Sequence, residues 1–91
     1  MPNFFVSYDL NGKTPTHAEM DKHLEKLGKC VARVLETVWY VRYNGTRKEL
    51  YDYANSILSE NDRLLVIESD SCRYHNLLPR GTKALDDCWM A

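Results

Sequence analysis

The sequence predicts a small α+β domain in which an antiparallel sheet carries helices on one face. Apolar and polar residues alternate at the start of the chain, two later stretches repeat apolar residues at the helical period, and β-branched and aromatic residues follow each helix. The chain has 91 residues and a net charge of −1, which excludes a strongly basic nucleic-acid binder. We expect one domain over residues 1–91, with a core at 3–68 and a C-terminal extension at 69–91.

The first expected strand places a carboxylate at its end. Its even-numbered residues are all apolar or aromatic and should face the core: Phe4, Val6, Tyr8 and Leu10. Its odd-numbered residues end in Asp9, at the carboxyl end of the strand, where ligand-binding groups tend to gather in open sheets. Asp9 is therefore the best candidate for a catalytic residue and metal ligand. The alternative is that its side chain hydrogen-bonds the backbone of the turn at Asn11 and Gly12.

Two helices are expected, at about 16–31 and about 46–59. A threonine followed three residues later by a glutamate forms a capping box before each: Thr16 with Glu19, and Thr46 with Glu49. Apolar residues then recur on one face, as in Met20, Leu24, Leu27 and Val31. Gly28 lies in the last turns of the first helix and should cost about 1 kcal/mol relative to alanine.

Two further strand signals follow the helices. Residues 34–43 form an unusually long one, which is expected to bend or to divide into two shorter strands. Residues 63–68 are apolar on both faces, so the sheet face away from the helices needs a cover. Either the C-terminal extension or a second copy of the chain should cover the residues available for that face, which are Phe5, Val34, Val38, Tyr40, Leu64 and Val66.

The order strand, helix, long strand, helix, strand is that of the split β-α-β, ferredoxin-like plan. A right-handed crossover is expected to put the first and last strands in or near the middle of the sheet. In the extension, Thr82 is expected to cap a short helix. Trp89 and Met90 should dock against the domain, because an exposed indole gains nothing.

Three segments resemble a known family. They are the opening strand at 4–10 with its Tyr-Asp pair, the segment 36–41 after the first helix, and the acidic turn and strand at 61–67. In order and spacing they look like the small ferredoxin-fold subunit of CRISPR adaptation and its relatives. Those relatives include the virulence-associated D-type toxin ribonucleases and small proteins of phages and mobile elements. The resemblance covers roughly residues 3–68.

The resemblance implies a homodimer of ferredoxin-like domains. In some family members, the aspartate that ends the first strand faces its twin across the dimer cleft and helps to hold a divalent metal for phosphodiester hydrolysis. Asp9 is the matching position in this chain. In members that act as scaffolds, the fold holds DNA. The chain departs from the family pattern in lacking basic character and in its different C-terminal extension.

Two surfaces are candidates for binding. The dimer interface is expected to include Phe5, Ser7, Leu64 and Val66. Arginines beside aromatic residues can bind phosphates and stack bases, which makes these residues candidates for contact with nucleic acid or another partner: Arg42, Arg47, Lys48, Tyr40, Tyr43 and Arg73. Such a patch also suits an acidic protein partner, or is simply a solvated surface.

Three cysteines, Cys30, Cys72 and Cys88, follow no framework spacing, so reduced thiols in a cytoplasmic protein are expected. Cys72, His75 and Cys88 offer three of the four ligands of a zinc site, and only the first two are spaced like a zinc motif. His17 and His23 do not share a helical face and are expected at the surface. No secretion signal, membrane span or phosphate-binding loop is recognised, so no membrane contact and no certain cofactor is expected.

Two functions are compatible with these observations. The first is a small dimeric, non-catalytic binding module that acts on nucleic acid or on a defence-system protein, for example as a phage-encoded inhibitor. The alternative is an endonuclease or endoribonuclease in which Asp9 from each subunit holds Mg²⁺. The near-neutral charge, the single carboxylate and the doubly apolar sheet favour the binding module.

Overall fold

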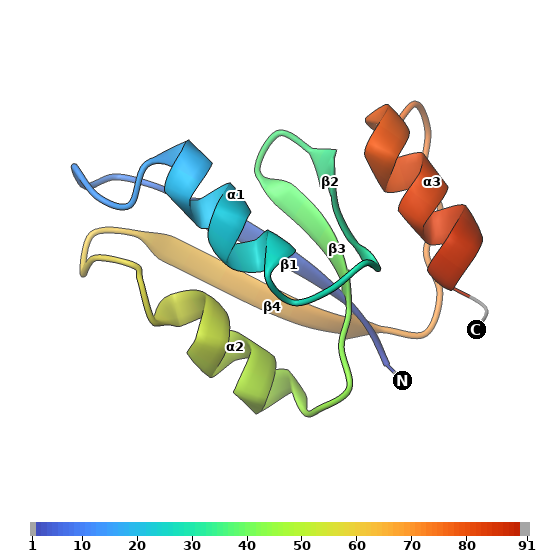
Figure 1. Cartoon of the computed structure of the whole chain (residues 1–91), viewed down its shortest axis with the longest axis horizontal. Helices are drawn as coiled ribbons and strands as arrows, with labels where there is room; N and C mark the ends of the chain where they lie inside the picture. The colour runs from blue at the N-terminus through green and yellow to red at the C-terminus, as the bar shows by residue number, and fades with distance from the viewer. Residues whose placement is uncertain (1, 90–91) are drawn as a thin grey trace.

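The computed structural model describes residues 2–89 and shows an α+β domain with a four-stranded antiparallel sheet (Figure 1). The elements in chain order are β1 (Asn3–Asp9), α1 (His17–Glu25), β2 (Val31–Leu35), β3 (Val38–Arg42), α2 (Arg47–Asn55), β4 (Arg63–Ser69) and α3 (Pro79–Cys88). This arrangement is consistent with the ferredoxin-like class expected from the sequence.

The strand order across the sheet is β2-β3-β1-β4. β1 is central, as expected, and pairs with both β3 and β4. The expectation that the last strand lies in or near the middle is wrong, because β4 forms one edge of the sheet and β2 forms the other. β3 already occupies one side of β1, so β4 pairs along the side of β1 that remains.

The helices α1 and α2 cover one face of the sheet, which confirms that part of the prediction (Figure 1). The even-numbered residues of β1 face these helices and are buried, as the alternation predicts. They form the main core with residues of α1, β3 and α2: Phe4, Val6, Tyr8, Met20, Leu24, Trp39, Val41, Leu50 and Ala54.

Both capping boxes form, with each threonine side chain accepting from the glutamate backbone N–H and each glutamate accepting from the threonine backbone. The helices are nevertheless shorter than expected. α1 ends at Glu25 rather than near residue 31, and Gly28 follows with a φ of +138°, a conformation that favours glycine. The chain therefore turns at Gly28 and enters β2 at Val31.

The long strand signal at 34–43 divides into β2 and β3, one of the two outcomes expected. The turn between them lies at residues 36–37, and the pairing register shifts between Arg33 and Leu35. β2 begins earlier than the signal because Val31 and Ala32, which the sequence assigned to the end of a helix and to the stretch after it, pair with Val41 and Tyr40.

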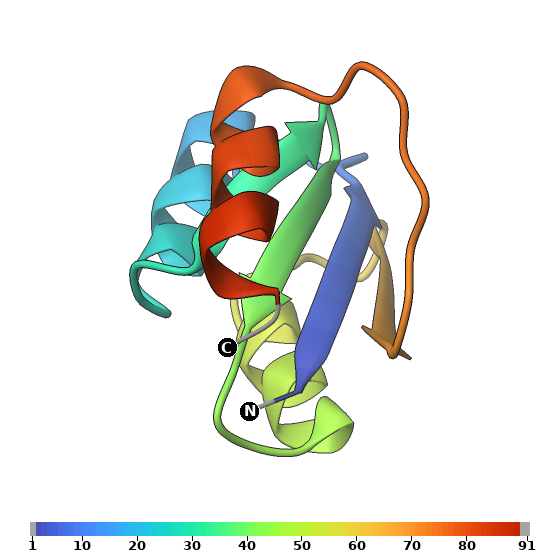
Figure 2. The same ribbon diagram turned by 90° about the vertical axis from the view of Figure 1, so that its right-hand side faces the viewer.

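α3 lies on the other face of the sheet, over β2 and β3 (Figure 2). Its residues Ala84 and Leu85 pack with Val34 and Tyr40 in a second buried cluster. Trp89, which follows α3, packs against Phe5 and Tyr40 with ring centroids 6.0 and 5.8 Å away. The predicted docking of Trp89 is thus confirmed, while Met90 lies outside the described residues.

A disulfide joins Cys30, just before β2, to Cys88 at the end of α3, with their Cα atoms 6.0 Å apart. The expectation of reduced thiols is therefore wrong for these two residues. The fold brings them together from positions 58 residues apart, a proximity that no local spacing reveals. Cys72 is a free thiol. Because Cys88 is bonded to Cys30, it is not available as the third ligand of the zinc site considered from the sequence.

Candidate functional site

The half of the second face that lies over β1 and β4 is not covered by α3 (Figure 2). Paired residues of neighbouring antiparallel strands share a face, and Phe5 pairs with Ile67 while Ser7 pairs with Leu65. We call these four residues the open face. Leu65 is 56% exposed and Ile67 45% exposed, and Phe5 and Ser7 are half-buried. Adjacent exposed apolar side chains of this kind mark interaction sites more often than isolated ones do.

The expected interface residues divide between two faces of the sheet. Phe5 and Ser7 belong to the open face, but Leu64 and Val66 pair with Tyr8 and Val6 and pack against the main core. The prediction that Leu64 and Val66 share a face of the sheet with Phe5 is therefore wrong. Side chains alternate along a strand, so the members of β4 that share the face of Phe5 are Leu65 and Ile67.

A cavity of about 270 Å³ lies between α3 and the connection at 70–78, where Trp89 packs beside Phe5 of the open face. Leu85, Asp86 and Trp89 line it from the helix side, and Cys72 and Tyr74 line it from the connection. Figure 2 shows this connection, in orange, running from the end of β4 around to the start of α3. Burial raises the pKa of the Cys72 thiol, so this residue stays protonated and weakly nucleophilic at neutral pH.

Asp9 ends β1 on the same side of the sheet as Phe5 and Ser7. It is largely exposed, and its Oδ2 lies 3.9 Å from Nη1 of Arg63, its partner residue on β4. Ser7, Asp9 and Arg63 line an open cavity of about 230 Å³. One carboxylate, already beside a cation, is a weak binding site for Mg²⁺ within a single chain.

The alternative role considered for Asp9, which was to hold the turn at Asn11 and Gly12, belongs to Asp62 instead. The Asp62 carboxylate accepts hydrogen bonds from the backbone N–H groups of Asn11 at 2.7 Å, Gly12 at 3.2 Å and Ser59 at 2.7 Å. The bonds from Ser59 and Asn11 are the main reason that the pKa of Asp62 is lowered. This role of Asp62 was not predicted from the sequence, although an aspartate in a polar turn is a common signal for such bonds.

Three of the expected partner-binding residues make contacts within the fold instead, and Tyr40 is the buried one among them. Arg42 donates from Nη1 to the backbone carbonyl of Cys88 at 2.7 Å, at the C-terminal end of α3 where a cation is favourable. Tyr40 is buried beneath α3 and donates to the side-chain oxygen of Asn3. Tyr43 is half-buried and packs edge-on against Phe4, with centroids 6.3 Å apart.

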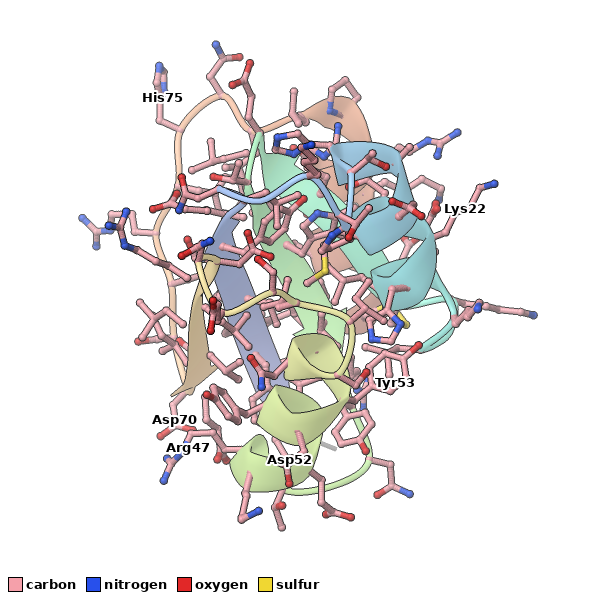
Figure 3. The ribbon with its side chains drawn as sticks, turned by 90° about the vertical axis from the view of Figure 1, so that its left-hand side faces the viewer. Lys22, Arg47, Asp52, Tyr53, Asp70 and His75 are labelled. Carbon is pink, nitrogen blue, oxygen red and sulfur yellow. A yellow bond between two sulfur atoms is a disulfide. The ribbon has the colours of Figure 1, made fainter. Side chains whose placement is uncertain are left out.

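The other three expected residues are exposed. Arg47 and Lys48 lie at the start of α2, where Lys48 pairs with Asp52 at 2.8 Å. Arg73 lies on the 70–78 connection. In Figure 3, Asp70, at the start of that connection, lies at the same end of the molecule as Arg47, and His75 lies at the opposite end. Because Tyr40 is buried and Arg42 is bonded to the end of α3, the six residues do not form one exposed surface.

A polar network inside the helix-covered layer was not recognised from the sequence. Asp21 of α1 forms an ion pair with Arg33 of β2 and accepts a hydrogen bond from the Tyr8 hydroxyl at 3.2 Å. The Arg33 guanidinium also lies 5.5 Å from the ring centroid of Trp39. The hydrogen bond to Asp21 raises the pKa of Arg33, and burial raises the pKa of Tyr8. These contacts tie α1 to the sheet.

His23 is not a free surface residue, contrary to the expectation. Its ring stacks on that of Tyr53, with centroids 4.0 Å apart, and the Tyr53 hydroxyl donates to the His23 backbone carbonyl at 2.6 Å. These contacts join α1 to α2, on the side of the molecule seen in Figure 3. A structural role accounts for them. His17 is exposed.

The described residues contain no group of three or more histidine, cysteine, aspartate or glutamate side chains placed to hold a metal ion. Within residues 2–89, none of the helices has the length and apolar character needed to cross a bilayer. Comparison with models of known protein families gives no match, and comparison with curated proteins gives none either. The case for a function rests on the site itself.

Proposed function

We propose that this chain is a non-catalytic binding module that forms a homodimer through the open face. The observation that carries the proposal is the contrast within one sheet face: α3 buries the half over β2 and β3, while Leu65 and Ile67 remain exposed on β4. Burying such side chains contributes roughly 25 cal/mol per Å² of apolar surface. A second copy would supply that cover in the way that a symmetric dimer does, with the same patch on both subunits.

The placement of the basic residues favours a protein partner over nucleic acid. Nucleic-acid binding relies on several cations that neutralise phosphates along one surface. Here Arg42 is used at the end of α3, Lys48 is paired with Asp52, and Lys83 is paired with Asp87 at 2.8 Å. With a net charge of −1, the chain offers little attraction to a polyanion.

Sedimentation velocity or light scattering over a concentration series tests the dimer. The wild type should sediment as a dimer at tens of micromolar, and Leu65→Lys should sediment as a folded monomer. Leu35→Lys is a matched control, because Leu35 is similarly exposed but lies at the end of β2, outside the open face. A monomeric wild type, or equal dissociation by both variants, would count against the proposal.

A metal-dependent nuclease is the second candidate, and one observation favours it. Asp9 lies on the side of the sheet that a dimer would bring together, so a second Asp9 could complete a metal site that one chain lacks. Labelled single-stranded RNA and duplex DNA should be incubated with Mg²⁺ or Mn²⁺ and with wild type or Asp9→Asn. Cleavage by the wild type alone would support the nuclease, and equal results for the two proteins would exclude it.

A further inference from the structure

We infer that the outer edge of β4, together with α2, forms a docking groove for an extended segment of a partner protein, which adds to the sheet as a strand and places an acidic side chain beside Arg47. The inference rests on the proposed binding function and names the class of partner. It concerns the outer edge of β4 and Arg47, which lie outside the open face, and only its flanking contacts reach Leu65 and Ile67.

The two edges of the sheet differ in how their backbone is protected. At the β2 edge, the backbone carbonyl of Val34 accepts a hydrogen bond from Leu78 N–H at 3.0 Å. α3 also approaches closely there, since a Cβ at Gly81 would come within 2.6 Å of the Arg33 carbonyl oxygen. On the outer edge of β4, no backbone hydrogen bond forms among the residues that the structure describes.

β4 also lacks several of the features that usually prevent strand addition. It has seven residues and pairs with β1 from Arg63 to Ser69 without a register shift, whereas β2 is short and irregular. Residues 64–67 are all apolar and include no proline, and the charged residues Arg63 and Glu68 flank them. Exposed edges are commonly blocked by short strands, bulges, proline or inward-pointing charges. An unblocked edge is the structural requirement for a partner strand to add by backbone hydrogen bonds.

A groove lies beside this edge on the helix-covered face. α2 runs next to β4 in Figure 1, and Arg47, Lys48, Tyr51 and Val66 line a cavity of about 260 Å³ between them. Side chains of an added strand point alternately to the two faces. The side chain opposite Val66 would enter this groove, and its two neighbours would lie beside Leu65 and Ile67 on the other face.

The charges in the groove select the side chain that enters it. Lys48 already pairs with Asp52, but Arg47 forms no ion pair with any other residue that the structure describes. The stem of a glutamate could pack against Tyr51 and Val66 while its carboxylate meets the Arg47 guanidinium. The neighbouring positions face Leu65 and Ile67 and should be apolar. Three successive residues of the partner strand are therefore expected to be apolar, acidic and apolar.

Fluorescence anisotropy with a short labelled peptide tests this prediction. A peptide with Val-Glu-Val at its centre should bind the wild type, and a Val-Lys-Val peptide should bind more weakly. Arg47→Glu should weaken Val-Glu-Val binding by about threefold to tenfold and should reduce or reverse the preference between the peptides. Arg80→Glu is the matched control, because Arg80 is exposed at the start of α3, on the β2 side of the sheet. It should leave both affinities unchanged.

Peptides methylated on alternate backbone nitrogens show whether the contact is strand addition. Methylation of the N–H groups that face β4 should abolish binding, and methylation of those that face away should not. Any of three results would overturn the inference. The first is that Val-Glu-Val does not bind, and the second is that the two methylated peptides bind equally. The third is that Arg47→Glu and Arg80→Glu lose the same amount of affinity. Sedimentation of Arg47→Glu separates the groove from the dimer, because Arg47 lies outside the open face. Failure of the dimer leaves the effect of Arg47 on peptide binding intact, and failure of the groove leaves the dimer intact.

Discussion

The two halves of the sheet meet their surroundings in opposite ways. Over β2 and β3, both faces are covered, because α1 packs on one side and α3 on the other, and a disulfide joins Cys30 to Cys88. Over β1 and β4, one face packs against α1 and α2 while the open face stays exposed. The C-terminal extension thus completes the core of one half only.

This difference shows which half is available for contact with other molecules. The covered half contains the buried aromatic residues of the second cluster and the backbone contact between Leu78 and Val34. The uncovered half contains exposed Leu65 and Ile67 and the unpaired edge of β4. An exposed apolar surface beside a well-anchored half is what a binding module requires, because the scaffold stays fixed while the surface meets its partner.

The same substitution in the two halves should give the largest contrast. Leu85→Lys places a charge in the buried cluster under α3 and should lower the free energy of unfolding by about 3–5 kcal/mol. Leu65→Lys changes a residue that is exposed in the single chain. At protein concentrations low enough for the wild type to be monomeric, it should alter the free energy of unfolding by less than about 0.5 kcal/mol. Urea unfolding monitored by circular dichroism would measure both free-energy changes. Similar losses in the two variants would mean that the halves do not differ as described.

Removal of the disulfide should have the next largest effect. Replacing both Cys30 and Cys88 with serine opens a covalent loop across 58 positions of sequence and should cost about 2–4 kcal/mol. Adding a reductant to the wild type should produce a loss of the same size. Cys72→Ser is the control and should change little, since Cys72 is a free thiol. Insensitivity of the wild type to reductant would contradict a structural role for the bond.

The acid dependence of stability should depend on Asp62. Backbone N–H groups, chiefly that of Ser59, hold the pKa of Asp62 below the usual value of about 3.9, so the unfolded chain binds this proton more readily than the folded one. The contribution of Asp62 to the free energy of unfolding is complete at pH values above its pKa in the unfolded chain. It is lost as the pH falls through the lower pKa of the folded protein. In the wild type, the urea concentration at the unfolding midpoint should fall as the pH drops below about 4. Asp62→Asn should make this fall smaller, whereas Asp86→Asn should leave it in place.

Asp9→Asn should have only a small effect on stability. The ion pair between Asp9 and Arg63 is exposed and 3.9 Å long, so its removal should cost less than about 1 kcal/mol. Arg63→Gln should give a change of similar size when thermal unfolding of the two variants is compared. A markedly larger loss in Asp9→Asn alone would indicate a structural role for the carboxylate beyond this ion pair.

Signals confined to a few neighbouring residues predicted the structure well. The capping boxes at Thr16 and Thr46 depend on residues three apart, and both form. The alternation in β1 correctly places Phe4, Val6 and Tyr8 in the core. In each case the contacts that decide the outcome lie within one element or follow directly from its period.

Features that depend on distant partners could not be obtained in this way. β4 is apolar at both even and odd positions, so its sequence does not reveal whether Leu64 or Leu65 faces the helices; the register with β1 decides this. The bond between Cys30 and Cys88 depends on where α3 docks. Asp62 likewise acts on backbone groups of residues 11 and 12, about fifty positions earlier in the chain.

The most direct test of the account measures solvent access to individual methyl groups. A soluble nitroxide speeds the NMR relaxation of methyl groups that it can reach. Its effect is recorded at increasing protein concentration for Leu65, Ile67 and Leu35, which are all exposed in the single chain. The account predicts that Leu65 and Ile67 become protected as the concentration rises, while Leu35 remains accessible. Unchanged access to Leu65 and Ile67 across the series would contradict the claim that the open face is an interface.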